Sequence, residues 1–175
     1  IMIGPKYGGA IFYGGAGNDR LIAIADIPSA HHIFYGGAGN DHLQGGLGGR
    51  DTLDGGTGDD TIHAGGGRNL IYAGHGNDDV TGGDGSSVIH TGPGRNLVKL
   101  AGGHDTIHAG AGVNLITAGK GNTVFVPIYG GVTIVDQWAV GQVYDLTAWP
   151  KPPILTVTHG VAEFTLGLTV LRVQG

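Results

Sequence analysis

Four aspartates recur at one position of a glycine-rich repeat, and together they could bind metal ions. Asp19, Asp41, Asp60 and Asp78 each follow a glycine-rich, turn-forming stretch. If the repeats stack as strands of a sheet, neighbouring carboxylates lie about 4.8 Å apart. Two carboxylates ~5 Å apart repel each other by roughly 3 kcal/mol at an effective dielectric constant of about 20. A hard divalent cation between the turns reverses this interaction, and calcium suits such a site because it accepts about six to eight oxygen ligands in irregular geometry.

The repeat that positions these aspartates is nine residues long. Eight consecutive copies run without a slip over residues 55–126, with the form Gly-Gly-x-Gly-x-Asp-x-apolar-x, clearest in GGTGDDTIH at 55–63. Looser copies begin at Gly14, Gly36 and Gly45. A fixed short period predicts a stacked solenoid, in which the first six residues of each copy form a turn and the last three a short strand.

The apolar eighth position of each copy predicts the core. Side chains alternate along a strand, so this position points inward and its two neighbours point outward. With two copies in each coil, alternate copies stack into two columns. Both inward columns are apolar throughout, which supports the register independently of the glycines. One contains Leu21, Leu43, Ile62, Val80, Val98 and Ile116, and the other contains Phe12, Phe34, Leu53, Ile71, Ile89, Ile107 and Phe125.

The sixth-position residues form two unequal columns. The first column contains Asp19, Asp41, Asp60, Asp78, Asn96 and Asn114. We expect calcium sites at the pairs Asp19/Asp41, Asp41/Asp60 and Asp60/Asp78, with a weaker fourth at Asp78/Asn96. The second column contains Asp51, Asn69, Ser87, Asp105 and Thr123. The second column has fewer carboxylates than the first, so calcium at Asp51, Asn69 or Asp105 is a weaker expectation. We favour turns that are closed by hydrogen bonds without metal on this side.

On these repeats the sequence resembles the repeats-in-toxin (RTX, hemolysin-type) calcium-binding family over roughly residues 14–126. The resemblance implies a parallel β-roll in which carbonyls and an aspartate from each of two successive turns hold the ion. Carried over to this sequence, it implies a ligand set that joins the first four aspartates to turn residues. These are Gly14, Ala16, Gly36, Gly37, Ala38, Gly39, Gly55, Gly56, Thr57, Gly58, Ala73, Gly74 and Gly76. The resemblance also implies unfolded export through type I secretion machinery and calcium-triggered folding outside the bacterial cell.

The period ends at Val126, which divides the chain. We expect an all-β protein with a β-roll over 1–126, a loop insertion at about 23–32, and a C-terminal capping β segment over 127–175. Residues 132–138 and 141–146 are similar to the stretch that follows the roll in serralysin-type C-terminal domains. Residues 155–160 and 164–173 alternate well enough for a closing hairpin, and a solenoid needs such a cap over its last coil. The family's secretion signal is less well matched, because the tail lacks the acidic residue before its final apolar cluster.

Composition narrows the functional classes. The 38 glycines and 7 prolines would suggest disorder without the period. The absence of cysteine excludes disulfides and thiolate metal sites. A net charge of −5 without a basic stripe argues against a nucleic-acid partner. No secretory signal peptide opens the chain, and no apolar run approaches the ~20 residues of a membrane span. Because Ile1 is not a start methionine, we expect the N-terminus to be a cut end of a larger protein. The resemblance implies that the chain is the terminal module of a secreted or cell-surface protein.

Two outward-facing groups leave alternatives open. The outer aromatic column, at the ninth position, contains Tyr13, Tyr35, Asp54, Tyr72, His90 and His108. It could bind polysaccharide by ring stacking, as an accessory module like those of alginate epimerases would, or reflect cross-strand pairing alone. His90 and His108 could also hold zinc or nickel. Outward Leu97 and Leu115 suggest cover by the cap or by another subunit, as in a surface layer, adhesin or fibre.

Catalysis finds little support in the sequence. Cysteine nucleophiles, Gly-x-Ser-x-Gly and His-Glu-x-x-His are all absent. We therefore expect a non-catalytic module, and any catalytic domain upstream would lie outside this chain.

Overall fold

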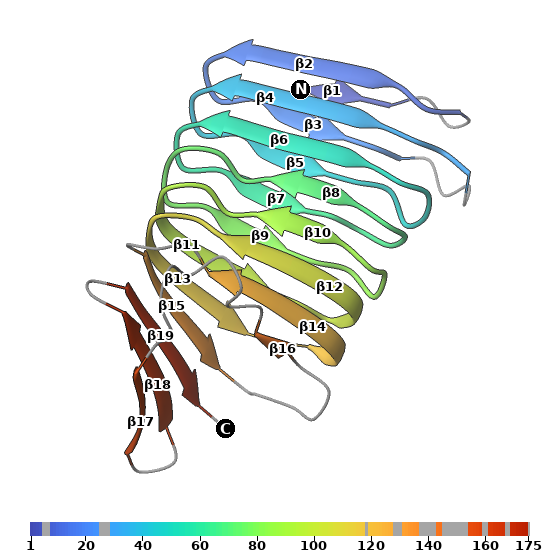
Figure 1. Ribbon diagram of the computed structural model, residues 1–175. Coiled ribbons are helices and arrows are strands. Elements are labelled where there is room, and N and C mark those ends of the chain that lie inside the picture. The colour runs from blue at the N-terminus through green and yellow to red at the C-terminus, as the bar shows by residue number, and fades with distance from the viewer. Residues whose placement is uncertain are drawn as a thin grey trace.

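The computed structural model is a solenoid of stacked parallel strands, with the N-terminus at one end and the C-terminus at the other (Figure 1). It describes residues 1–4, 8–24, 29–117, 119–127, 131–136, 143–144, 154–158, 161–166 and 169–174. Every regular element within these residues is a strand, which confirms the all-β class. A helix long and apolar enough to cross a membrane is likewise absent from this described part.

Two sheets face each other across the core. The first runs through β1 (Met2–Ile3), β3 (Arg20–Ile22), β5 (His42–Gln44), β7 (Thr61–His63), β9 (Asp79–Thr81), β11 (Gly94–Lys99), β13 (Gly112–Thr117) and β15 (Gly131–Asp136). The second runs through β2 (Ile11–Ala16), β4 (Ile33–Ala38), β6 (Thr52–Thr57), β8 (Leu70–Tyr72), β10 (Val88–His90), β12 (Gly102–Ala109), β14 (Lys120–Pro127) and β16 (Val143–Tyr144). Odd and even strands pair separately and in parallel, so the chain alternates between the sheets and each coil contains two repeats. The predicted parallel β-roll is confirmed.

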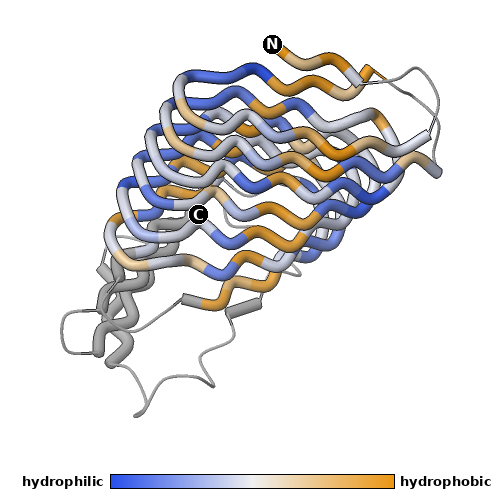
Figure 2. The backbone as a smooth tube through the Cα atoms, turned by 90° about the horizontal axis from the view of Figure 1, so that it is seen from above, coloured by the Kyte–Doolittle hydropathy of each residue, from blue (hydrophilic) through white to orange (hydrophobic). Residues whose placement is uncertain are grey.

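The core lies where the eighth positions of the repeat were expected. All residues of both predicted inward columns are buried; Phe12, at the N-terminal end, is the most exposed of them at 5%. Figure 2 shows the orange apolar stretches recurring at matching places in successive coils. The parallel register places Leu43 beside Ile62 and Ile71 beside Ile89, as the period requires. The nine-residue pattern therefore fixes which side chains enter the roll.

Both ends of the expected loop insertion lie among the described residues. Ala23 is 6% exposed and its N–H donates to the carbonyl of Gln44, so it continues the first sheet. Ala30 and His32, at 1% and 0% exposed, are also part of the roll. Residues 25–28 of the expected loop lie outside the described residues. Ala23 and His32 therefore have partners in the next coil, and the bounds of the loop insertion stay a prediction.

Three further strands follow the roll: β17 (Ile154–Thr158), β18 (Val161–Leu166) and β19 (Thr169–Gln174). β18 pairs antiparallel with both neighbours, and β19 joins the first sheet beside β15 in parallel. The expected hairpin is present, but its second segment, 164–173, spans parts of two strands rather than one. Of the two segments similar to serralysin-type C-terminal domains, residues 137–138, 141–142 and 145–146 lie outside the described residues.

Candidate metal centre

The aspartates of the first column point into the roll where each turn enters its strand. Asp41, Asp60 and Asp78 are each 2% exposed, and Asp19 in the first coil is half-buried. Backbone N–H groups link them from coil to coil by donating to Oδ1 of the next aspartate. These bonds measure 2.7 Å from Asp19 to Asp41, 2.7 Å from Asp41 to Asp60 and 2.9 Å from Asp60 to Asp78. A bond of 3.1 Å joins Asp78 to Oδ1 of Asn96 in the same way. The structure therefore brings together all four expected pairs.

Glycine shapes the turns that present these aspartates. Gly37 and Gly39 have φ angles of 110° and 120°, in a region that residues with a Cβ rarely adopt. The expected turn ligands lie in four stacked turns, formed by residues 14–19, 36–41, 55–60 and 73–78. The third-position carbonyls of Ala38 and Thr57 accept N–H groups from the preceding coil at 2.7 and 2.8 Å. Each carbonyl keeps a second lone pair that could serve a metal ion.

The other carboxylate oxygens of this column have no partner. Oδ2 of Asp41, Asp60 and Asp78 is buried, and each lacks a hydrogen bond among the described residues. A buried polar atom without a partner costs about 1–3 kcal/mol, and more when it is charged. Three such oxygens in one column indicate that a positive group belongs beside them.

The first position of the repeat provides the space for that group. A Cβ built on Gly36 would meet Oδ2 of Asp41 and the carbonyl oxygen of Gly55 in the next coil. Gly55 stands in the same relation to Oδ2 of Asp60 and the carbonyl oxygen of Ala73. Two oxygens thus converge on a space that any side chain would fill, and this donor set fits a hard cation such as calcium. In the Asp78 turn the corresponding residue is Ala73, whose methyl group leaves less room.

Burial and mutual repulsion disfavour the charged form of these carboxyls. Burial raises the pKa of Asp60 to about 7, and the Asp78 and Asp41 carboxylates add to the rise, while the Asp41 N–H opposes it. Burial also raises the pKa of Asp41 and of Asp78. A bound cation would favour ionisation of all three. The column is therefore arranged to exchange protons for a metal ion near neutral pH.

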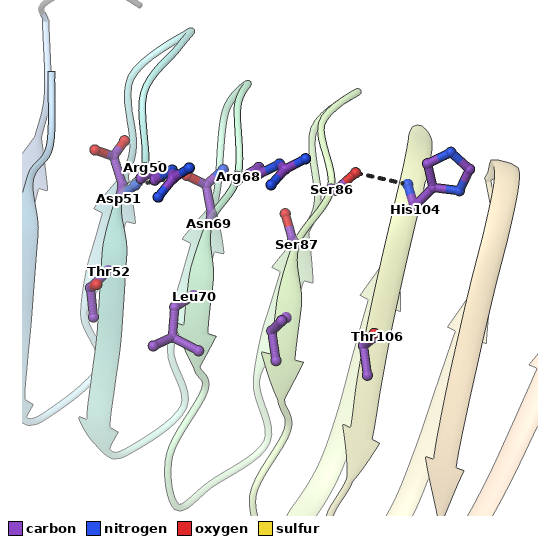
Figure 3. Close-up of a pocket in the computed structure, with 11 residues that line it drawn as sticks. Arg50, Asp51, Thr52, Arg68, Asn69, Leu70, Ser86, Ser87, His104 and Thr106 are labelled. Atoms are coloured by element: carbon purple, nitrogen blue, oxygen red, sulfur yellow. Dashed lines mark hydrogen bonds between the residues drawn. The ribbon is translucent and has the colours of Figure 1, made fainter. Parts of the chain in front are cut away.

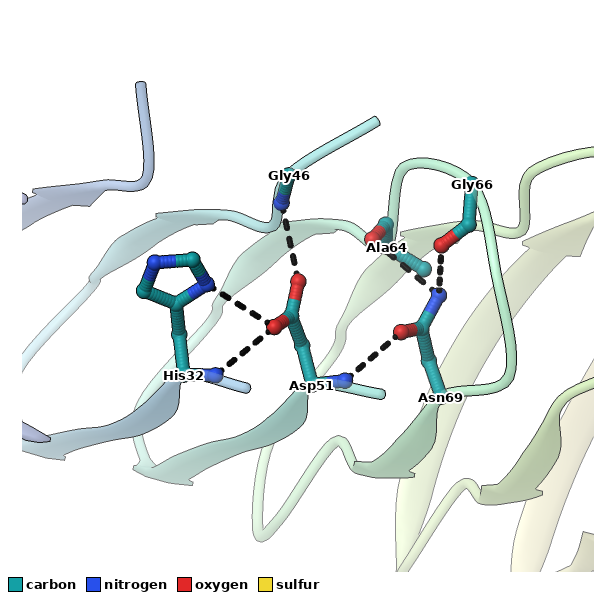
Figure 4. Close-up of polar contacts among 6 residues, drawn as sticks. All are labelled: His32, Gly46, Asp51, Ala64, Gly66 and Asn69. Atoms are coloured by element: carbon teal, nitrogen blue, oxygen red, sulfur yellow. Dashed lines mark hydrogen bonds and ion pairs between the residues drawn. The ribbon is translucent and has the colours of Figure 1, made fainter. Parts of the chain in front are cut away.

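The second column closes its turns with hydrogen bonds instead. Asn69 donates from Nδ2 to the carbonyls of Ala64 and Gly66, at 3.2 and 3.0 Å (Figure 4). Its amide thereby supplies the positive end that a metal ion would otherwise provide. Oδ2 of Asp51 accepts the N–H of Gly46 at 2.9 Å, so this carboxylate is satisfied inside the protein. These contacts support the expectation that the second column needs little metal.

His32 is a participant that the sequence analysis missed. It is 0% exposed, and its backbone N–H and ring Nδ1 lie 2.8 and 3.0 Å from Oδ1 of Asp51 (Figure 4). It occupies the sixth position of the second column one coil before Asp51. Counting two residues back from Phe34, an eighth-position residue, would have identified it.

The remaining members of the columns follow the same division. Asn96 donates from Nδ2 to the Gly92 carbonyl at 3.2 Å and to Oδ1 of Asn114 at 3.1 Å. Asn114 donates to the Gly110 carbonyl at 2.9 Å. Asp105 accepts the N–H of Ser87, and burial raises the pKa of Asp105 to about 6. Its neighbours in the second column are Ser87 and Thr123, so it has no carboxylate beside it with which to share a metal ion.

The outer aromatic column is a stack of rings. Tyr13 and Tyr35 stack at 5.1 Å, Tyr72 and His90 at 4.9 Å, and His90 and His108 at 4.5 Å between ring centroids. Rings stacked on one another present edges to solvent, so a sugar could lie on a ring face only at the ends of a stack. The planes of His90 and His108 are 6° apart, so their nitrogen lone pairs run side by side and do not converge on one zinc or nickel ion.

Two further observations bear on the alternatives. Among the described residues, no group of three or more His, Cys, Asp or Glu side chains is placed to hold a metal ion, so any site depends on carbonyls as well as carboxylates. Leu97 and Leu115 are aligned on neighbouring strands, and Leu115 is 41% exposed. Self-association through them stays a prediction.

Comparison with known families gives one match. The sequence model for the RTX calcium-binding nonapeptide repeat, a unit of four copies, matches residues 7–23, 33–61, 46–80, 54–89, 72–107 and 90–125. Together these segments cover more than half of the chain. No curated protein matches it.

Proposed function

Because the chain belongs to the family of RTX calcium-binding nonapeptide repeats and forms its β-roll, we propose that calcium binds in the turns of the first column. The ions lie at the pairs Asp19/Asp41, Asp41/Asp60 and Asp60/Asp78, with Asp78/Asn96 as the weakest. The observation that carries this assignment is the row of buried, unpartnered Oδ2 atoms at Asp41, Asp60 and Asp78.

When bound, calcium supplies the positive charge that cancels repulsion within the column. The protein's own groups do the rest. In Asp41 and Asp60, Oδ1 accepts a backbone N–H and so fixes the carboxylate orientation, which leaves Oδ2 directed at the space beside the first-position glycine. The unfolded chain lacks this arrangement, so the free energy of calcium binding becomes free energy of folding.

The coils of the roll should differ in how much their folding depends on calcium, because the second column and the end of the first column carry asparagines. Asn69, Asn96 and Asn114 donate amide N–H bonds where the aspartate turns have orphaned oxygens. The C-terminal coils therefore need less calcium than the N-terminal ones. A chain of this kind folds its N-terminal coils onto a pre-ordered C-terminal part once calcium is available.

Such a switch suits a protein that is exported unfolded. We place the chain in a larger secreted or cell-surface bacterial protein that leaves through type I secretion machinery and folds in calcium outside the cell. Support comes from the family, whose members are typically exported, and from the calcium-dependent design of the N-terminal coils. The β-roll acts as a non-catalytic module, and strands β17–β19 cap its last coil. That role is supported by β19, which pairs with β15, and by the antiparallel β18, which shields the parallel edge.

The proposal is tested by adding calcium to protein freed of metal with a chelator and monitoring the change by circular dichroism. The number of bound ions and the oligomer mass are measured in parallel. We expect β structure to grow with calcium near millimolar concentration. Asp60→Ala should weaken calcium binding, since Asp60 belongs to two pairs, and Asp105→Ala is the matched control from the second column. Equal calcium binding by wild type and Asp60→Ala would contradict the site assignment.

A further inference from the structure

A groove on the second sheet carries positive charge that no described residue balances. Its volume is about 430 Å³, and it crosses four successive coils at the start of β6, β8, β10 and β12 (Figure 3). The fifth-position residues Arg50, Arg68, Ser86 and His104 follow one another along it. Outward Leu70 and Val88 form an apolar part of its wall. The groove thus runs along the axis of the roll.

The two arginines are not used inside the protein. Neither guanidinium makes an ion pair or a hydrogen bond among the described residues. Asp51 also lines the groove, but its side chain is 0% exposed and its oxygens accept bonds from His32 and Gly46. The parallel pairing of β6 with β8 places Arg50 and Arg68 at equivalent positions of successive coils, just before strands that lie about 4.8 Å apart. The like charges therefore stand side by side without an internal anion.

The opposite column shows that this is not the ordinary use of the fifth position. There, Asn18 and Asn40 accept N–H groups of the next coil through their side-chain oxygens, at 2.8 and 3.0 Å. In the groove, only Ser86 makes such a bond, accepting the N–H of His104 at 3.2 Å. The arginines replace structural acceptors by exposed donors. Guanidinium groups match carboxylate, sulfate and phosphate oxyanions with two parallel hydrogen bonds.

We propose that this groove binds an acidic oligosaccharide through Arg50 and Arg68. Its carboxylate or sulfate groups pair with the two guanidiniums, its hydroxyls bond to Ser86 and His104, and a ring face lies on Leu70 and Val88. An extended chain fits because the groove is open along the roll and repeats its donors once per coil. Nucleic acid is disfavoured, since the net charge is −5 and two arginines make too small a basic surface. The site lies outside the calcium pairs and needs only the folded roll.

Isothermal titration of the calcium-saturated protein tests the proposal with three probes of equal length: a uronate oligosaccharide, a sulfated one and a neutral one. We expect binding of at least one acidic probe and none of the neutral probe, and the stronger acidic probe identifies the oxyanion. Arg68→Gln should weaken binding by about tenfold, the loss expected for one charge-assisted hydrogen-bonded contact. Arg95→Gln is the matched control, because Arg95 occupies the fifth position of the opposite column and removes the same charge outside the groove.

Four results would overturn the proposal. They are binding of neither acidic probe, equal binding of the neutral probe, equal losses in Arg68→Gln and Arg95→Gln, and stronger binding of a single-stranded oligonucleotide. Circular dichroism of each variant in calcium verifies the fold, and Arg50→Gln gives a second independent loss.

Discussion

Replacing Asp60 by asparagine should have opposite effects with and without calcium. In the metal-free protein Asp60→Asn removes the central charge of the column. The new amide can donate to the carbonyls of its own turn, as Asn69 does to Ala64 and Gly66. In calcium the same change removes a charged ligand from two of the proposed sites.

The raised pKa of Asp60 sets how much stability Asp60→Asn can add to the metal-free protein. Burial, mainly, shifts the pKa of Asp60 from 3.8 to about 7, and this rise corresponds to at most about 4 kcal/mol. The folded state binds more protons than the unfolded state between these values. The contribution of Asp60 to the stability of the metal-free fold is therefore complete below about pH 4 and is lost as the pH rises through about 7. Asp60→Asn should therefore flatten the pH dependence and stabilise the metal-free fold at pH 7.5.

Urea unfolding at pH 7.5, in chelator and in calcium, measures both effects. We expect a higher midpoint than wild type in chelator and a lower one in calcium. Asp84→Asn is the matched control, because Asp84 is an exposed aspartate in a turn of the second column. A variant less stable than wild type in chelator would refute the claim that charge repulsion limits the metal-free fold.

Three further changes test other parts of the structure. Gly55→Ala places a methyl group against Oδ2 of Asp60 and should weaken calcium binding by about tenfold, or about 1.4 kcal/mol. Gly82→Ala should not, because its methyl group would approach the Leu100 side chain most closely and no carboxylate; equal calcium titrations of the two variants would contradict a calcium site beside Gly55. Calcium binding should release more protons at pH 6 than at pH 8, because the raised pKa of Asp60 keeps its carboxyl protonated at pH 6 until calcium binds. Calorimetry in buffers of different ionisation enthalpy measures the number of protons released, and equal release at both pH values would contradict the raised pKa. Ile62→Ala should lower the free energy of unfolding by about 2–5 kcal/mol in calcium, since Ile62 is 0% exposed, and a loss below 1 kcal/mol by urea titration would argue against its place in the core.

The periodic part of the fold could be predicted from the sequence because one pattern sets several features at once. A nine-residue period fixes the strand position, the inward eighth residue and the alternation between two sheets. Leu43, Ile62 and Val80 are therefore buried where the pattern put them. The stacking of Asp41 on Asp60 follows from the same register.

Features outside the period could not be predicted in this way. The extent of the insertion depends on Ala23 and His32 finding partners in the next coil, and the local sequence does not encode that contact. The groove at Arg50 and Arg68 depends on which outward side chains lack partners, a property of the three-dimensional neighbourhood. The stacking of His90 on His108 was visible in the spacing, but its parallel planes, which argue against a shared metal, were not.

Residue-resolved hydrogen exchange at pH 7.5, with calcium and with chelator, tests the central claim most directly. The N–H groups of Asp41 and Asp60 donate to carboxylates of the next coil, while those of Val88 and Thr106 donate to carbonyls of the second sheet. The account predicts that chelation removes protection at Asp41 and Asp60 and largely preserves it at Val88 and Thr106. Full protection of Asp41 and Asp60 in chelator would contradict it.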